Sequence, residues 1–390
     1  MLMALPPILR AGFRPFFLGG SAWAIIALAL WISTLRGLVN LPTGFEPVAW
    51  HRHEMLFGYL GAVITGFLLT AVPNWTGRIP ISGTRLALLA ALWLAARLAL
   101  LGSAYVGAVT AALLDVGFFA VLTVLIGREI LAARNRNVPV VVALAVFTLA
   151  CALDHGEALG ANILGGLGWR LGFGIVLVLI AFIGGRIIPS FTRNWLAGRP
   201  GADRLPRQPD RFDLAALAFL VPALLSWVAL PESRVAGELL VVAGLLQFVR
   251  LTRWSGIRSL GEPLVAILHV SFLWLPAGLV LLGTAAFTDR IVPSAALHLL
   301  SAGAMASMTL AVMTRATLGH TGRPLHADRL TIAIFALVTT GALLRFAAPF
   351  LPVGYMAAIE VAALIWGGAF LLFLVGYGPK LLGSRPDGRP

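Results

Sequence analysis

Residues 53–78 read HEMLFGYLGAVITGFLLTAVPNWTGR, and residues 298–323 read HLLSAGAMASMTLAVMTRATLGHTGR. Aligned without a gap, the two stretches share their first histidine, one glycine, one alanine and the closing Thr-Gly-Arg. Each is an apolar run long enough to cross a bilayer as a helix. A histidine at the edge of such a run is costly unless it is solvated, paired or bound to a ligand. Two such histidines on matching helices predict a shared ligand.

The composition of the whole chain is that of a polytopic membrane protein. Of its 390 residues, 59% are hydrophobic and 12% are charged, and the mean hydropathy is +0.93. Soluble domains are close to half apolar and a quarter charged. Because lipid cannot satisfy exposed backbone groups, and the apolar runs are long rather than alternating, the spans are predicted to be helices. The expected fold class is an all-α polytopic membrane protein.

Twelve apolar runs are long enough to be spans of one membrane domain over residues 1–390. They lie at about 15–35, 54–73, 85–102, 104–127, 138–153, 170–190, 212–230, 235–251, 263–283, 292–314, 329–350 and 353–377. The sixth run ends in a weak echo of the second and tenth, at residues 184–193. The second, sixth and tenth runs are each four runs apart, which suggests that the chain consists of three four-helix units.

The basic residues are distributed asymmetrically about these runs. All but one of the 29 are Arg, and most lie in short loops. With twelve spans, 21 of them fall on the side of the N-terminus and five on the other side. The positive-inside rule then predicts an inner-membrane protein with both termini in the cytoplasm. The same distribution explains the net charge of +13 without nucleic acid as a partner, and leaves membrane lipid as the expected one.

The motif WHRHEM at residues 50–55 is the densest group of candidate ligands. Neutral imidazole is the commonest side-chain ligand for transition metals and also binds haem iron. If His53 opens its helix, His51 lies in the entering loop and approaches a ligand from another angle. The alternative is a Trp-His-Arg cluster that anchors the helix among lipid headgroups.

Other histidines are candidates with simpler alternatives. His269 lies inside the ninth run and needs a partner, either an interhelical hydrogen bond or a metal. His155 belongs to a polar group at residues 154–157, for which a solvated loop is the simpler interpretation. His320 lies near the end of the tenth run, and His326 is expected to be a solvated loop residue.

Arginines within apolar runs need anions. Arg97, Arg186 and Arg345 lie inside runs, where they can pair with Asp115, with Glu360 or with the propionates of a haem. The lone Cys151 also lies in an apolar run. It predicts no intrachain disulfide and no metal site built on cysteines.

Two long motifs closely resemble the NnrS family. One is WHRHEMLFG at residues 50–58, continued by GFLLTAVPNWTG at residues 66–77, and the other is MTLAVMTRATLGHTGR at residues 308–323. GFRPFF at residues 12–17, with GR at 185–186 and FT at 191–192, is also of this family's type. Arg52 stands where a smaller residue is expected. The resemblance implies a twelve-span bacterial inner-membrane protein that contains haem and copper and acts in nitric oxide metabolism and resistance to nitrosative stress.

On this resemblance, His53 and His298 are the predicted axial ligands of a haem, expected to be of type b. Further candidate ligands for haem or copper are His51, His155, His269 and His320, and candidate partners of the propionates are Arg186, Arg315 and Arg97. Ligands on the second and tenth helices also look like the haem-bearing helices of subunit I of haem–copper oxidases, an analogy at the level of fold. The sixth and seventh runs contain no His, so the copper site of the oxidases cannot be reproduced.

Two other functions stay open. A transporter or export channel for a small anion or metabolite, without metal, suits twelve spans, internal repetition and buried arginines. A catalytic nitric oxide reductase or oxidase would need electrons from a partner protein, because the sequence contains neither a Cys-x-x-Cys-His site nor a second redox domain. The expected partners are therefore nitric oxide or another small gas and an electron-donor protein.

Overall fold

The computed structural model describes residues 5–199 and 205–388, and these residues form helices and no strand. Within them, twelve helices are long and apolar enough to cross a membrane. Each of the twelve predicted runs corresponds to one of these helices, so the all-α polytopic fold is confirmed. Pro263 and Pro293 occupy the first positions of their helices, where the missing N–H is not needed.

The contacts between helices divide the chain into two compact units, whereas the sequence suggested three. Unit 1 contains Met1–Ile175, Met313–Pro324 and Phe373–Pro390, and unit 2 contains Val176–Val312 and Leu325–Leu372. Three helices therefore begin in one unit and end in the other. They are α8 (Leu167–Leu196), α13 (Ala306–His320) and α15 (Tyr355–Leu382).

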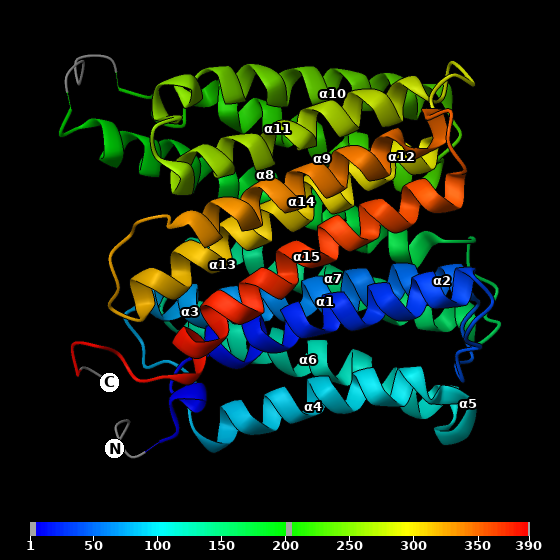
Figure 1. Cartoon of the computed structure of the whole chain (residues 1–390), viewed down its shortest axis with the longest axis horizontal. Coiled ribbons are helices and arrows are strands. Elements are labelled where there is room, and N and C mark those ends of the chain that lie inside the picture. The colour runs from blue at the N-terminus through cyan, green and yellow to red at the C-terminus, as the bar shows by residue number, and fades with distance from the viewer. Residues whose placement is uncertain (1–4, 200–204, 389–390) are drawn as a thin grey trace. The chain divides into compact units, whose positions relative to one another are not determined.

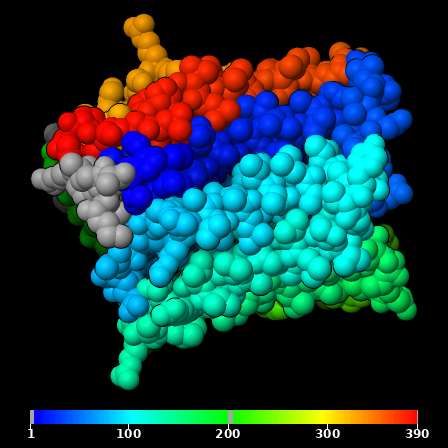
Figure 2. Space-filling model, turned by 90° about the horizontal axis from the view of Figure 1, so that it is seen from below, coloured from blue at the N-terminus to red at the C-terminus, as the bar shows by residue number. Residues whose placement is uncertain are grey.

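Unit 1 is built from the N-terminal helices, drawn from blue to green in Figure 1. They are α1 (Phe13–Leu35), α2 (Pro47–His53), η3 (Glu54–Leu60), α3 (Gly61–Thr76), α4 (Thr84–Leu101), α5 (Ser103–Val106), α6 (Ala108–Ala132) and α7 (Val138–Ala158). α1 packs on α3, α4 on α6, and α6 on α7. In Figure 2 the cyan segments around residue 100, which belong to unit 1, face the viewer.

Unit 2 is built from the later helices. They are α9 (Arg211–Ala229), α10 (Arg234–Thr252), η4 (Gly256–Ser259), α11 (Pro263–Thr284), α12 (Pro293–His298), η5 (Leu299–Met305), α14 (Arg329–Ala347) and η6 (Ala348–Phe350), with parts of α8, α13 and α15. α10 packs on α9 and α11, and η5 packs on α11 and α14.

The two matching sequence stretches fold alike. α2 ends at His53 and is followed by the π-helix η3, and α12 ends at His298 and is followed by the π-helix η5. The closing Thr-Gly-Arg of both stretches has its glycine in the left-handed region, Gly77 with φ 70° and Gly322 with φ 68°. π-Helices are rare and frequently lie at functional sites. The sequence match is therefore a structural repeat that places one histidine next to a π-helix in each unit.

Two helix boundaries correct the sequence interpretation. α2 begins at Pro47, so His51 lies on the helix with His53 and not in an entering loop. α7 continues to Ala158, past the predicted end of its run at about residue 153. The solvated loop expected for residues 154–157 is therefore wrong, and His155 is buried.

Candidate metal centre

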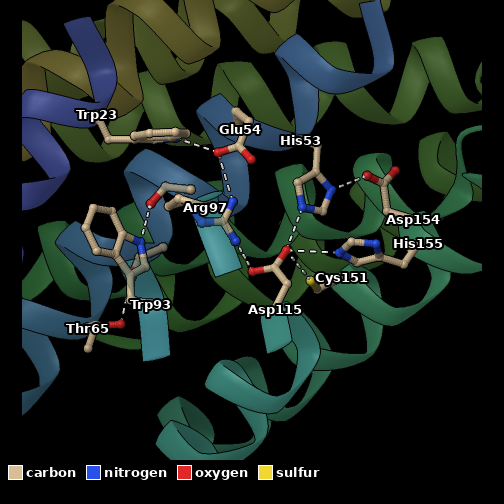
Figure 3. A network of polar contacts seen from close by, with 12 residues as sticks. Trp23, His53, Glu54, Thr65, Trp93, Arg97, Asp115, Cys151, Asp154 and His155 are labelled. Carbon is tan, nitrogen blue, oxygen red and sulfur yellow. Dashed lines mark hydrogen bonds and ion pairs between the residues drawn. The ribbon is translucent and has the colours of Figure 1, made fainter. Parts of the chain in front are cut away.

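Four potential metal ligands from three helices meet inside unit 1 (Figure 3). His53 comes from the end of α2, Asp115 from α6, and Cys151 and His155 from α7. Each offers one ligand atom, and these atoms all lie within 4.8 Å of one another. His53, Asp115 and Cys151 are 0% exposed and His155 is 2% exposed. The repeat histidine of unit 1 is therefore part of a buried cluster of mixed chemistry.

The cluster converges on one oxygen, Asp115 Oδ2. His53 Nε2 lies 2.7 Å from this oxygen and His155 Nε2 lies 3.0 Å from it. The Cys151 thiol donates to the same oxygen at 3.5 Å. Since a carboxylate accepts hydrogen bonds, both imidazole nitrogens carry protons in this arrangement. A metal ion that replaced these protons would be held by the same two nitrogens, the sulfur and the oxygen.

His53 is oriented from its other ring nitrogen. Nδ1 donates to Asp154 Oδ2 at 2.7 Å, from one turn further along the helix that carries Cys151. Metal-binding histidines almost always donate their second N–H to a carboxylate, a carbonyl or water, which fixes the ring and makes the ligating nitrogen more basic. Asp154 therefore stands where a metal site needs a supporting carboxylate.

Arg97, on α4, holds Asp115 from the opposite side. Its Nη2 donates to Asp115 Oδ1, and its Nη1 donates to Glu54 Oε2 at 2.9 Å. Trp23 Nε1 donates to the same Glu54 oxygen at 2.5 Å. Arg97 and Glu54 are both 0% exposed. Of the alternatives for Arg97, pairing with Asp115 is the one present, and it leaves Oδ2 of Asp115 to the cluster.

The charges of the site favour a cation. When ionised, the carboxylates of Glu54, Asp115 and Asp154 carry three negative charges. Two arginines oppose them: Arg97, which is buried with Glu54 and Asp115, and Arg52, which acts on Asp154 electrostatically. A buried charge is costly unless it is balanced nearby. Protons on the imidazoles balance the excess, and a divalent cation bound between His53 and His155 would balance it as well.

Aromatic rings surround the cluster. The ring of His53 lies 5.1 Å from that of Phe45 and 4.9 Å from that of Phe57. Phe57 in turn packs on Phe147 at 4.9 Å, and Phe147 packs on Phe119 at 5.1 Å. These apolar neighbours exclude water, and a low local dielectric strengthens the electrostatic contacts between polar groups.

The donor set fits copper or zinc. Imidazole and thiolate ligands suit these metals, whereas Ca²⁺ and Mg²⁺ prefer oxygen ligands. Bonds of about 2.0–2.3 Å to a four-coordinate ion place its ligand atoms about 3.3–3.8 Å apart. Donor atoms within 4.8 Å of one another need to move by little to reach that geometry.

His298, the repeat histidine of unit 2, has a different environment. Its Nδ1 donates to the backbone oxygen of Ser294 at 2.6 Å, which directs Nε2 away from its own helix turn as the possible ligating atom. Arg345, at the end of α14, is close enough to act on His298 electrostatically. Nη1 of Arg345 is buried and has no hydrogen-bond partner among the described residues.

His269 forms an interhelical hydrogen bond. Its Nε2 lies 2.8 Å from Thr192 Oγ1, and this hydroxyl donates its own proton to the backbone oxygen of Ile188. His269 Nε2 is therefore the donor. Nδ1 is buried without a hydrogen-bond partner in the described parts of the chain, next to Gly256. Of the two alternatives for His269, the interhelical hydrogen bond is thus present, and a metal bound at Nδ1 stays a prediction.

The remaining predicted ligands lie outside the four-residue cluster. His51 stacks on Trp31 of α1 with ring centres 4.7 Å apart. His320 is exposed at the end of α13, with its ring 5.7 Å from that of Phe13. Arg186 is exposed, with its guanidinium 3.9 Å from the ring centre of Phe182. Arg315 is half-buried on α13, and His326 is exposed, as expected.

The sequence named His155 as a candidate ligand but did not place Cys151 or Asp154 in the site. Cys151, Asp154 and His155 lie at positions i, i+3 and i+4 of α7, a spacing that places them on one helix face. The predicted end of the run at about residue 153 hid this spacing. The single cysteine supports no site built on cysteines, but it does join a mixed set of ligands.

The comparison with known families agrees with this architecture. The NnrS family model, described as NnrS protein, matches residues 7–385. None of the curated proteins compared with the chain matches it. The family match covers nearly the whole chain, including both repeat stretches and all residues of the candidate metal centre. The chain belongs to the NnrS family.

Proposed function

We propose that this chain is a copper- and haem-binding protein of the bacterial inner membrane, with both termini in the cytoplasm, that protects the cell against nitric oxide. The observation that carries the proposal is the convergence of His53, His155 and Cys151 on Asp115 Oδ2. Membership of the NnrS family supports the link to nitric oxide.

The copper site would be held by His53 Nε2, His155 Nε2 and Cys151 Sγ, with Asp115 Oδ2 as the fourth ligand. Bound copper would supply a redox-active metal that binds nitric oxide directly, and redox turnover would call for an electron-donor protein. Arg97 fixes Asp115 through Oδ1. The aromatic rings packed on Phe57 and His53 exclude water from the site.

The haem is best supported at His298. Its Nδ1–backbone bond presents Nε2 as a ligating atom, and the unpartnered Nη1 of Arg345 suits a propionate. The axial pair of His53 and His298 stays a prediction. His53 would have to give up its contact with Asp115 or Asp154 in order to bind iron.

The alternative of an anion transporter loses one of its supports. Arg97 is one of the three arginines within apolar runs that suggested an anion pathway, and it is paired with Glu54 and Asp115. A transporter of this kind needs no metal, so metal content separates the two functions.

The test is metal analysis, with oxidised and reduced absorption spectra, of protein from cells supplied with iron and copper. We expect about one copper per chain in the wild type, following the one such donor set within the described residues. His155→Ala and Cys151→Ser should lose copper, whereas the exposed loop variant His326→Ala should retain it. A wild-type protein free of both metals would remove the proposal and favour the transporter.

A further inference from the structure

We propose that Phe45 is the selectivity-determining residue of the metal centre, which admits small uncharged ligands and excludes large or charged ones. The proposal rests on the proposed metal centre for its biological meaning. Its geometry rests on contacts within unit 1 alone.

Phe45 lies over both imidazoles of the cluster. Its ring centre is 5.1 Å from that of His53 and 5.4 Å from that of His155, with interplanar angles of 61° and 89°. The residue belongs to the connection between α1 and α2, yet it is only 7% exposed. A loop phenylalanine is thus almost fully buried and packs on both histidines.

The connection that carries Phe45 is fastened to α5. Gly44 N–H donates to Ser103 Oγ at 2.8 Å, and Thr43 Oγ1 lies 3.2 Å from the same hydroxyl. Ala104 N–H donates to the backbone oxygen of Pro42 at 3.1 Å. Ser103 is 3% exposed, so its hydroxyl is largely shielded from water. These hydrogen bonds fix the position of the loop that carries Phe45.

Aromatic rings also close the site on the side of η3. Phe57, on η3, contacts His53, and Phe147 of α7 packs on Phe57. Both rings are at most 1% exposed. His53 thus contacts two aromatic rings, those of Phe45 and Phe57.

This arrangement discriminates by size and charge. A neutral diatomic molecule such as nitric oxide dissolves in lipid and passes between aromatic rings without losing strong hydration. A charged ligand loses its hydration on entering such surroundings, which is costly. A bulky ligand can enter only when Phe45 moves, and that requires release of the bonds to Ser103.

Cys151 provides the test, because it is the only cysteine of the chain. The full-length protein, purified without copper, would be treated with methyl methanethiosulfonate, which is small and uncharged, and with a bulky sulfonated maleimide. In the wild type we expect slow reaction with the first reagent and almost none with the second. Phe45→Ala should raise the maleimide rate about tenfold or more, because this rate follows the population of the open state.

Two further variants sharpen the result. Ser103→Ala leaves the cluster intact and removes the fastening, so it should raise the maleimide rate to a smaller extent. Phe287→Ala alters an exposed phenylalanine of unit 2, 45% exposed, and should react as the wild type does. If Phe45→Ala does not fold, Phe45→Leu and Ser103→Ala answer the same question.

Equal maleimide rates in the wild type, the Phe45 variants and Ser103→Ala would overturn the proposal. Because the labelling uses protein without copper, its outcome does not depend on metal content. A protein that binds no copper would remove the metal centre, whereas unchanged labelling in a copper-binding protein would remove only the role of Phe45.

Discussion

His53 is held between two carboxylates, with Asp154 Oδ2 2.7 Å from Nδ1 and Asp115 Oδ2 2.7 Å from Nε2. The two contacts have different roles in the proposed metal centre. Asp115 would share the metal with His53, while Asp154 would orient the ring from behind. Substitution of the orienting residue should therefore weaken metal binding without removing a ligand.

Asp154→Asn should lower copper affinity about 10–100-fold, the usual effect of losing a partner of a ligating histidine. The amide oxygen can still accept from Nδ1, but it carries no charge to raise the basicity of the ring. Competition with a chelator of known affinity measures the change. Glu157→Gln is the matched control, because Glu157 accepts from the backbone of Gly166 instead. Equal affinities for all three proteins would show that Asp154 does not support a metal ligand.

Arg97→Leu should destabilise the protein by about 3–5 kcal/mol, because it leaves Glu54 and Asp115 buried without their counter-charge. Unfolding in mixed micelles of increasing SDS content measures the loss. Arg78→Leu is the control. Arg78 pairs with Glu129, but the side chains are 44% and 25% exposed, so its loss should cost less than about 1 kcal/mol. Equal costs for the two variants would contradict a structural role for the buried network.

The spans were predictable from the sequence because every segment that crosses lipid must satisfy its own backbone hydrogen bonds. Runs of apolar residues of bilayer length must be helices, and Pro263 lies at a helix start as its missing N–H requires. The matching histidines also marked equivalent positions. His53 and His298 each precede a π-helix, and the pattern of apolar residues there is the same for a π-helix as for an α-helix.

The metal centre was less predictable because it depends on contacts between distant residues. Asp115 and Cys151 meet only because α6 packs on α7. Asp154 and His155 ended the apolar pattern, so hydropathy placed them in a loop. They remain helical and buried because Asp154 pairs with His53 and His155 pairs with Asp115, and these pairings remove the cost of burial.

Gly58→Ala tests the close packing between η3 and α1. A Cβ at this position would lie 2.3 Å from Glu54 Oε2 and 2.8 Å from Trp23 Nε1, so the bond between these side chains must break or shift. We expect a loss of about 1–3 kcal/mol in unfolding free energy. Gly117→Ala on α6 meets nothing within 4 Å and should instead stabilise the helix by about 0.5–1 kcal/mol. The same sign for both variants would contradict the packing at Gly58.

Asp210 predicts a pH dependence outside the spans. It caps α9 and pairs with Arg253, and this hydrogen bond lowers the pKa of Asp210 from 3.8 to about 2. Because the folded pKa lies below the unfolded one, the contribution is complete above the unfolded value and is lost as the pH falls through about 2. Asp210→Asn should therefore flatten the pH dependence of the unfolding temperature across this range. The control is Asp289→Asn, in an exposed loop, which should leave the pH dependence of the unfolding temperature unchanged. If Asp210→Asn also left it unchanged, the ion pair of Asp210 with Arg253 would not contribute to stability.

His53→Ala and His298→Ala should separate the two proposed cofactors. His53 lies in the cluster of nitrogen, sulfur and oxygen donors, so its loss should remove copper and leave the haem spectrum intact. His298 keeps Nε2 for a ligand and is within electrostatic reach of Arg345, so its loss should remove the haem and leave copper bound. Iron and copper analysis with reduced absorption spectra measures both changes, with His326→Ala as the control. If His53→Ala also abolished the haem spectrum, His53 would be an axial ligand, and the copper site would have to be built without it.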